Sequence, residues 1–286
     1  ALYGAPYRVS ISVILYNKEI YSDLGLSVPS TMDELLSNCK AIQAAGIQPF
    51  TFANSEQWPA PQWIGAFNQK LVAPEVMAAD YSLKGDFSDP GYLKAFDVWS
   101  QLLAYASPDA NSKTYSISEE EFASGSVAMM WGESVSVGDI NLLNPDCSFG
   151  CFAVPAIVGG AGDNTGIQGG PEGFVVSSGT AHPEEAAKLV KFLSSPEVGK
   201  LMMADLQWFN GCADVVNASA EGLTPIEEAY TFLNNSTGLL PFMDTAMNSS
   251  VASVYIASMQ SYVDGGITAE GVMEAVRTEA EFCAAE

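Results

Sequence analysis

Apolar and polar residues alternate with a period of two over residues 9–16, and this pattern predicts a β-strand. Short apolar runs between turn residues predict three more strands, over residues 127–131, 149–154 and 174–176. Apolar residues at helical spacing predict helices over residues 31–46, 89–103, 183–193, 245–263 and 268–283, one from residue 196, and a short one that ends at Gly125. Strands that alternate with helices are typical of an α/β fold.

Two segments have the composition of a capping box, in which a Ser or Thr and a Glu three positions later each satisfy a backbone amide at the start of a helix. Thr31 and Glu34 form the first, ahead of the helix that Gly46 ends. Ser118 and Glu121 form the second, ahead of the short helix. We therefore expect a helix to begin at each of these places.

The charge balance excludes nucleic acid as a partner. The chain has 286 residues with 11 Lys+Arg against 34 Asp+Glu, which gives a formal net charge of −23. Binding to nucleic acid phosphates or to anionic membranes requires clustered basic residues. The 48% of hydrophobic residues supply a substantial core, and no apolar run is long enough to cross a bilayer.

The reactive residues form no metal or catalytic pattern. Five cysteines and a single His lack zinc-ligand spacing, and we interpret the cysteines as small buried apolar residues whose pairing stays open. His182 stands before a proline at a predicted helix start. The glycine-rich residues 158–170 match neither of the phosphate-binding patterns GxxxxGK(S/T) and GxGxxG. We expect no cofactor, no metal and no enzymatic activity, and we place a flexible connection at 158–170.

Aromatic rings occur with amide and carboxylate side chains in three turn-like segments: residues 54–59 with Trp63, residues 130–134 and residues 207–210. Such combinations suit a sugar, because a sugar ring has apolar C–H faces and a rim of hydroxyls. Each tryptophan in these segments has a second interpretation as a core residue. Trp99, at helical spacing with Phe96 and Leu103, is assigned to the core.

Several short motifs follow one another in an order that a known family shares: YGAPY at 3–7, LYNKE at 15–19, LGL at 24–26, PSTMDELL at 29–36, DFSDP at 86–90, FASGSVAMM at 122–130, HPEEAAK at 182–188 and FLSSPEV at 192–198. Together they resemble the family 1 extracellular solute-binding proteins, the carbohydrate receptors of ABC importers that include maltose-binding protein. Each motif is weak alone, and their shared order over nearly the whole chain carries the resemblance.

The resemblance implies a type II periplasmic-binding-protein-like fold, with two α/β lobes that close on a ligand by a hinge. By that pattern, residues 1–157 form the main part of the C-terminal lobe, with a hinge strand near 1–9. Residues 158–224 are what remains of the N-terminal lobe, and residues 225–286 are helices that return to the C-terminal lobe. The family's first strands have no counterpart, so we expect an incomplete N-terminal lobe, through truncation or a missing segment.

The resemblance also points to individual ligand-binding residues. In the family, the segment that aligns with Glu56, Gln57 and Trp58 ends in an aromatic residue that stacks on sugar. Trp58 is therefore the first candidate, with Glu56 as a hydroxyl acceptor. Ser10 aligns with a ligand-binding carboxylate of maltose-binding protein, which implies a weaker polar contact here, and Arg8 lies nearby.

This chain departs from the family at a stacking tryptophan that follows a glycine by two residues, because Glu133 and Ser134 come after the glycine here. Ser134 offers a hydroxyl, Glu133 can accept a hydroxyl or bind a cation, and Trp131 lies on the other side of the glycine. The remaining candidates belong to a glycine-rich strand and to the cleft rim: Gly170, Glu172, Trp208, Phe209 and Asn210.

By resemblance, the chain is a monomeric extracytoplasmic receptor, periplasmic or a cell-surface lipoprotein. It captures a carbohydrate, an oligosaccharide in particular, and delivers it to the permease subunits of an ABC importer. The same fold with a cationic or polar non-sugar ligand stays open, because of Glu56, Glu133, Glu172 and the missing tryptophan. A glycoside hydrolase and a sensor that signals to a membrane kinase are further alternatives.

Overall fold

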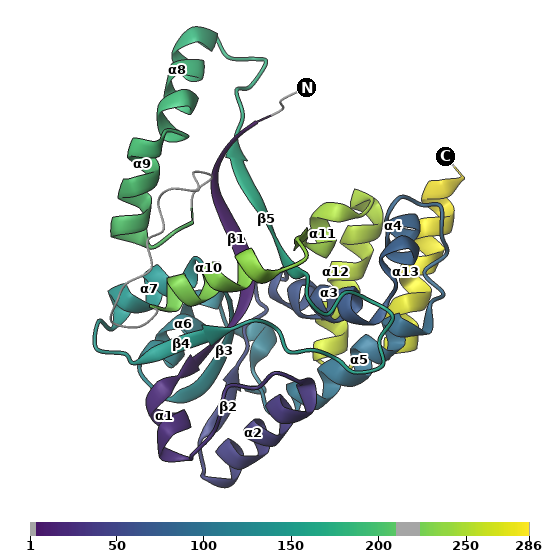
Figure 1. Ribbon diagram of the computed structural model, residues 1–286. Coiled ribbons are helices and arrows are strands. Elements are labelled where there is room, and N and C mark those ends of the chain that lie inside the picture. The colour runs from purple at the N-terminus through teal and green to yellow at the C-terminus, as the bar shows by residue number, and fades with distance from the viewer. Residues whose placement is uncertain (1–3, 210–223, 286) are drawn as a thin grey trace.

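The computed structural model describes residues 4–209 and 224–285 of the chain. Its centre is the long strand β1 (Ala5–Asn17), which runs from the body of the molecule into a protruding arm (Figure 1). Within a mixed sheet, β1 lies antiparallel to β3 (Val127–Glu133), β4 (Phe149–Phe152) and β5 (Ile167–Phe174). Two strands are parallel to their neighbours: β2 (Gln48–Thr51) beside β3, and β6 (Leu239–Leu240) beside β5.

Helices cover the sheet and form one side of the body, and the α/β class that the sequence predicted is confirmed. None of the helices in the described ranges is long and apolar enough to span a membrane. Their bounds are α1 (Lys18–Asp23), α2 (Met32–Ala44), α3 (Pro59–Leu71), α4 (Pro74–Tyr81), α5 (Pro90–Leu103), α6 (Tyr115–Ala123), α7 (Ser136–Leu143), α8 (Pro183–Leu193), α9 (Pro196–Leu201), α10 (Pro225–Asn235), α11 (Met243–Ala246), α12 (Ser249–Val263) and α13 (Ala269–Ala284), with a 3₁₀ turn at Ala110–Ser112 and a π-helical turn at Met202–Leu206.

Strand β1 is buried on both faces in the body of the molecule. Ile14 belongs to a large apolar cluster with Trp63 and Phe67 of α3, whereas Val13 and Leu15 belong to a second cluster. Neighbouring residues of a strand point to opposite faces, so one strand joins the two cores. This double burial fixes the position of the polar residues that precede Val13 on the same strand.

The first capping box is confirmed and the second is wrong. Thr31 and Glu34 form the reciprocal hydrogen bonds at the start of α2. Helix α6 starts earlier than we predicted, because Thr114 caps it by accepting from a backbone amide. Ser118 and Glu121 lie inside that helix and turn towards β2 instead, where the Thr51 hydroxyl donates to Glu121 and lies 3.0 Å from Ser118 Oγ.

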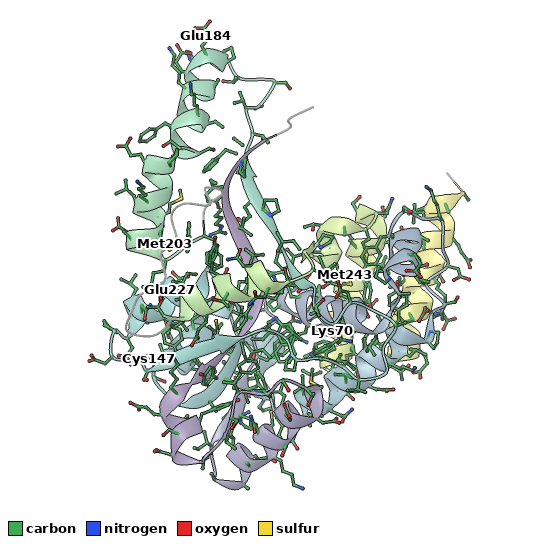
Figure 2. All side chains as sticks on the ribbon, viewed as in Figure 1. Lys70, Cys147, Glu184, Met203, Glu227 and Met243 are labelled. Carbon is green, nitrogen blue, oxygen red and sulfur yellow. The ribbon has the colours of Figure 1, made fainter. Side chains whose placement is uncertain are left out.

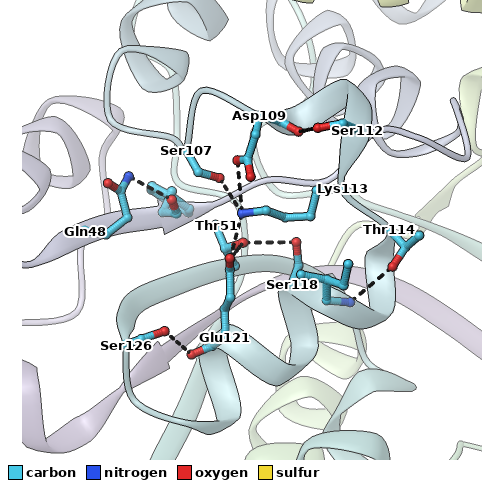
Figure 3. A network of polar contacts seen from close by, with 12 residues as sticks. Gln48, Thr51, Ser107, Asp109, Ser112, Lys113, Thr114, Ser118, Glu121 and Ser126 are labelled. Carbon is cyan, nitrogen blue, oxygen red and sulfur yellow. Dashed lines mark hydrogen bonds and ion pairs between the residues drawn. The ribbon is translucent and has the colours of Figure 1, made fainter.

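A buried lysine holds α6 against this strand (Figure 3). Lys113 Nζ donates to Glu121 Oε2 at 2.8 Å and to Ser107 Oγ at 2.9 Å, and it lies 3.3 Å from Asp109 Oδ1. Thr51 Oγ1 donates to the same Glu121 oxygen at 2.5 Å. The network therefore ties α6 and the 107–113 loop to the edge of the sheet.

Replacing Lys113 with methionine is expected to lower the free energy of unfolding by about 2 kcal/mol, measured by urea denaturation. The methionine fills the same space but leaves Glu121 and Asp109 without their cation. The loss stays below that of a fully buried ion pair because Glu121 remains partly exposed to water. Lys94→Met on the exposed face of α5 is the control. An equal effect of both substitutions would contradict a stabilising role for the network.

Helices α8 and α9 stand on the arm, beyond the body of the molecule (Figure 1). The sequence predicted an inward apolar face on α8, namely Ala186, Ala187, Leu189, Val190 and Leu193. No residue of α8 is buried, and Leu189 is 57% exposed and Phe192 53% exposed. The described residues therefore do not make the contact that the amphipathic pattern predicts.

The glycine-rich residues 158–170 are anchored, which corrects the flexible connection that their composition predicted. The backbone amides of residues 161–163 donate to the carbonyls of residues 69–71 at 2.8–3.2 Å. A Cβ at Gly160 or Gly162 would lie 2.1 or 2.2 Å from one of those carbonyl oxygens. Glycine is thus required there by a close backbone approach to the end of α3.

The strand that we predicted at 174–176 lies earlier in the chain, because β5 ends at Phe174. The glycines of β5 give it no alternation of apolar and polar residues, so the sequence pattern did not indicate a strand there. A Cβ at Gly169 would lie 2.4 Å from the carbonyl oxygen of Ser10. The glycines therefore let β5 lie close against β1, where the candidate residues gather.

Candidate ligand-binding site

The carboxylate of Glu133, the last residue of β3, lies between β1 and α3. The Ser10 hydroxyl and the Gln62 amide both donate to it, Gln62 over 2.5 Å. Ser134 is buried, and its Oγ accepts from the backbone amide of Ile11 at 3.3 Å. The structure thus brings the predicted residues Ser10, Glu133 and Ser134 together, with Ser134 engaged by the backbone of β1.

Trp58 stands at the N-terminus of α3, where it is half-buried against a second aromatic ring. Its ring centroid lies 4.7 Å from that of Tyr115, at an interplanar angle of 50°. The Glu56 carboxylate accepts from the Tyr115 backbone amide at 3.1 and 3.2 Å. Tyr115 Oη in turn accepts from the Glu133 amide at 3.2 Å and lies 2.8 Å from Ser136 Oγ. Tyr115 therefore connects Trp58, Glu56 and Glu133 into one platform.

Gln57 lies in the turn that presents Trp58. Its φ of 69° is in the left-handed region, and its side chain is exposed. Nε2 of Gln57 donates to Oε1 of Gln260 on α12 at 3.0 Å. The turn is thus tied to α12, and Gln57 occupies the rim of the platform.

A clasp of charged and aromatic residues lies where β1 and β5 leave the body. Arg8 donates to both carboxylate oxygens of Glu172 at 2.7 Å, and its guanidinium lies 4.4 Å from the centre of the Trp208 ring. Tyr7 Oη also donates to Glu172, at 3.2 Å. We predicted Glu172 as a ligand contact, and the structure shows it already paired with Arg8 across the two strands.

Two of the predicted aromatic residues are core residues in the structure. Trp131 is 4% exposed, stacks on Trp63 at 4.4 Å between ring centroids and meets the edge of Phe67. Phe209 is also buried, and its carbonyl accepts from the Val9 amide. We therefore leave Trp131 and Phe209 out of the proposed site. Asn210 lies outside the described residues.

A cavity of about 350 Å³ runs along β5 beside the clasp. Gly170 and Glu172 line it from the strand, and Leu239 and Phe242 provide an apolar wall. Gly170 pairs with Ser10 across the strands, and no atom lies within 4 Å of where its Cβ would be. The backbone at Gly170 is therefore open, and Gly170 stays a candidate ligand contact.

Sequence reasoning missed Tyr115 and Gln62. Tyr115 is the first residue of α6, and the misplaced capping box hid the start of that helix. Gln62 lies in α3, a helix that the sequence analysis did not predict. The described residues include no cluster of His, Cys, Asp and Glu that could hold a metal ion.

The fold matches that of two-lobe, type II solute-binding proteins among solved structures. A comparison with protein-family models matches residues 1–200 to the bacterial extracellular solute-binding protein family, and the chain belongs to this family. The fold class that we predicted from the sequence resemblance is thereby confirmed. Among solved structures, a chitin oligosaccharide binding protein is similar with a TM-score of 0.90 at 22% identity, over 100% of this chain and 72% of that one. The solute-binding protein RafE in complex with raffinose has a TM-score of 0.79 at 22% identity, over 97% and 72%.

Curated relatives share the same family. An uncharacterized ABC transporter extracellular-binding protein of Pyrococcus horikoshii is 26% identical over 96% of this chain and 60% of its own length. The multiple sugar-binding protein of Streptococcus mutans is 29% identical over 68% of this chain and 47% of its own length. The chain thus spans about half to three fifths of the length of these relatives.

Proposed function

We propose that this chain captures a neutral carbohydrate, an oligosaccharide in particular, and presents it to the permease subunits of an ABC importer. The observation that carries the proposal is the Trp58–Tyr115 ring pair beside the Glu133 carboxylate. The sugar ligands named for the chitin oligosaccharide binding protein, RafE and the Streptococcus mutans relative support it. We place the protein outside the cytoplasm, in a periplasm or on the cell surface as a lipoprotein, and as a monomer.

The platform offers both kinds of contact that a sugar needs. The exposed face of Trp58 gives apolar contact to sugar C–H groups. Ser10 and Gln62 hold the Glu133 carboxylate in one orientation, and the lone pairs that they leave free can accept ligand hydroxyls. Closure of two lobes over the ligand would then raise the population of the form that the permease recognises.

A cationic or polar non-sugar ligand is the second candidate. The observation in its favour is the partly exposed Glu133 together with the exposed Glu56. Glu172, the third carboxylate that suggested it, is already paired with Arg8 and offers less to a cation. The binding of a cation would weaken as salt increases, whereas the binding of a neutral sugar would not.

A thermal-shift screen tests the proposal. The samples are this chain and a form extended with the segment that the relatives carry and this chain does not span. The ligands are mono- and oligosaccharides, polyamines and amino acids. A sugar present at about 100 times its dissociation constant stabilises the native state by about 2.7 kcal/mol. Stabilisation by one class of sugar supports the proposal, and stabilisation by polyamines alone contradicts it.

Replacing Glu133 with glutamine is expected to weaken binding of that sugar about tenfold, measured by calorimetric titration. The amide keeps the shape of the side chain but accepts hydroxyl protons less strongly than the carboxylate does. Glu120→Gln, an exposed carboxylate of α6 outside the platform, is the matched control. If Glu133→Gln bound as tightly as the control, Glu133 would not contact the ligand.

A further inference from the structure

A second cavity, of about 240 Å³, has a lining distinct from the Trp58 platform. The C-terminal half of α3, the start of β5 and the end of α10 enclose it, and none of the platform residues lines it. Lys70 is the one charged side chain among the described residues that line it. Figure 2 labels Lys70 inside the body of the molecule, near Met243 of α11, in contrast to Glu184 at the outer end of the arm.

Lys70 is 4% exposed, yet none of the described carboxylates lies within ion-pair distance of its ammonium group. Its Nζ donates to the carbonyl oxygen of Asn164 at 3.2 Å. An ammonium group has three donors, so this single bond leaves two of them available. A buried charge without a partner is costly, and an acceptor in the cavity would offset that cost.

Gln168 supplies a second unused donor at the same cavity. It is 3% exposed, and Ser12 Oγ donates to its Oε1 at 2.8 Å, which orients the amide group. Its Nε2 has no hydrogen-bond partner among the described residues and is itself buried, 2.7 Å from where a Cβ of Gly65 would lie, so the amide group must turn to reach a ligand in the cavity. The lining thus combines two donor groups with unused hydrogens, Lys70 Nζ and Gln168 Nε2, with the apolar side chains of Val154, Ile167 and Phe232.

We propose that this cavity is a second ligand site, which binds a small monocarboxylate with a short apolar tail. The carboxylate accepts from Lys70 Nζ and Gln168 Nε2, and the tail contacts Phe232 and its apolar neighbours. One cation that no described carboxylate pairs with suits a single negative charge, and a protein with a net charge of −23 disfavours a dianion such as phosphate. The cavity shares no lining residue with the carbohydrate platform.

The protonation of Lys70 gives the site a pH dependence. Burial lowers the pKa of Lys70 to about 8, while the charge of nearby Asp163 acts in the opposite direction. Asp163 is the charged group that faces Lys70 from the adjoining loop, and the other groups at the cavity are uncharged. Because a carboxylate binds the ammonium form, affinity should be full near pH 6.5 and fall as the pH rises through 8.

Calorimetric titration with butyrate tests the proposal, with the uncharged isostere butyramide and with inorganic phosphate as comparisons. Butyrate is expected to bind with a dissociation constant of order 1 mM at pH 6.5, and butyramide and phosphate at least about tenfold more weakly. Raising the pH to about 9.5 should weaken butyrate at least about tenfold, because most Lys70 side chains are then neutral.

The variant Lys70→Met should abolish butyrate binding, whereas Lys40→Met, an exposed lysine of α2, should leave it unchanged. The comparison with butyramide and the pH series use the unaltered chain, so they stand even if Lys70→Met fails to fold. Absence of saturable binding up to about 50 mM butyrate would mean that the cavity holds water only and would overturn the proposal. Equal binding of butyrate and butyramide would overturn it as well.

Discussion

Replacing Trp58 with alanine is expected to lower the affinity for the carbohydrate ligand by a factor of about 30, which corresponds to about 2 kcal/mol. Trp58 presents a half-buried indole that packs at a tilt against the ring of Tyr115. Alanine removes the flat surface on which a sugar ring would lie, and it leaves the polar contacts of Glu133 in place. The substitution should therefore lower the affinity for the sugar and leave unchanged the selectivity among sugars that differ in hydroxyl stereochemistry.

The measurement is a calorimetric titration of the unaltered protein, Trp58→Ala and Trp58→Phe with the sugar that the screen identifies. Trp58→Phe keeps an aromatic face and should lose only about threefold in affinity. Urea denaturation should show a small change in stability for both variants, since the side chain is partly exposed. If Trp58→Ala bound the sugar with wild-type affinity, Trp58 would not contact the ligand.

Replacing Trp131 with alanine is expected to lower the free energy of unfolding by about 4 kcal/mol. The indole stacks on Trp63 and meets Phe67, so its removal opens a cavity in the larger of the two cores. Its Nε1 has no hydrogen-bond partner among the described residues, so the loss comes from packing. Trp131→Phe keeps a ring in place and should cost about 1.5 kcal/mol.

Urea denaturation measures the two stabilities, and titration of Trp131→Phe with the same sugar separates the two roles that the sequence left open for this residue. A core residue changes stability and leaves affinity within about twofold of the unaltered protein. A tenfold loss of affinity at nearly unchanged stability would instead mean that Trp131 contacts the ligand.

Periodicity predicted some elements, such as β1 and α2, and missed others, such as α3 and α10. Strand β1 and helix α2 follow their patterns, and the Thr31–Glu34 capping box is present. Every residue of α3 (Pro59–Leu71) is buried, the polar Gln62, Asn68, Gln69 and Lys70 included, so this helix does not follow the rule that polar positions face water. The sequence also contains a signal for the start of α10 that we did not use, namely the capping box that Thr224 and Glu227 form there.

The sequence offered individual candidate residues but not the contacts between them. Ser10 and Glu133 were both candidates, but their hydrogen bond depends on the antiparallel register of β1 and β3, which composition does not reveal. The pairing of Arg8 with Glu172 likewise depends on the register of β1 and β5. Tyr115 reaches Glu133 only because Thr114 starts α6 one residue before it.

The most direct test of the account is a calorimetric titration of the extended protein with neutral oligosaccharides at low and high salt. The account predicts saturable binding of at least one neutral oligosaccharide, with a dissociation constant that salt leaves within about twofold, since screening acts on charges. No binding of any sugar, together with salt-sensitive binding of a polyamine or another cation, would contradict it. The fold would then remain, and the carbohydrate assignment would not.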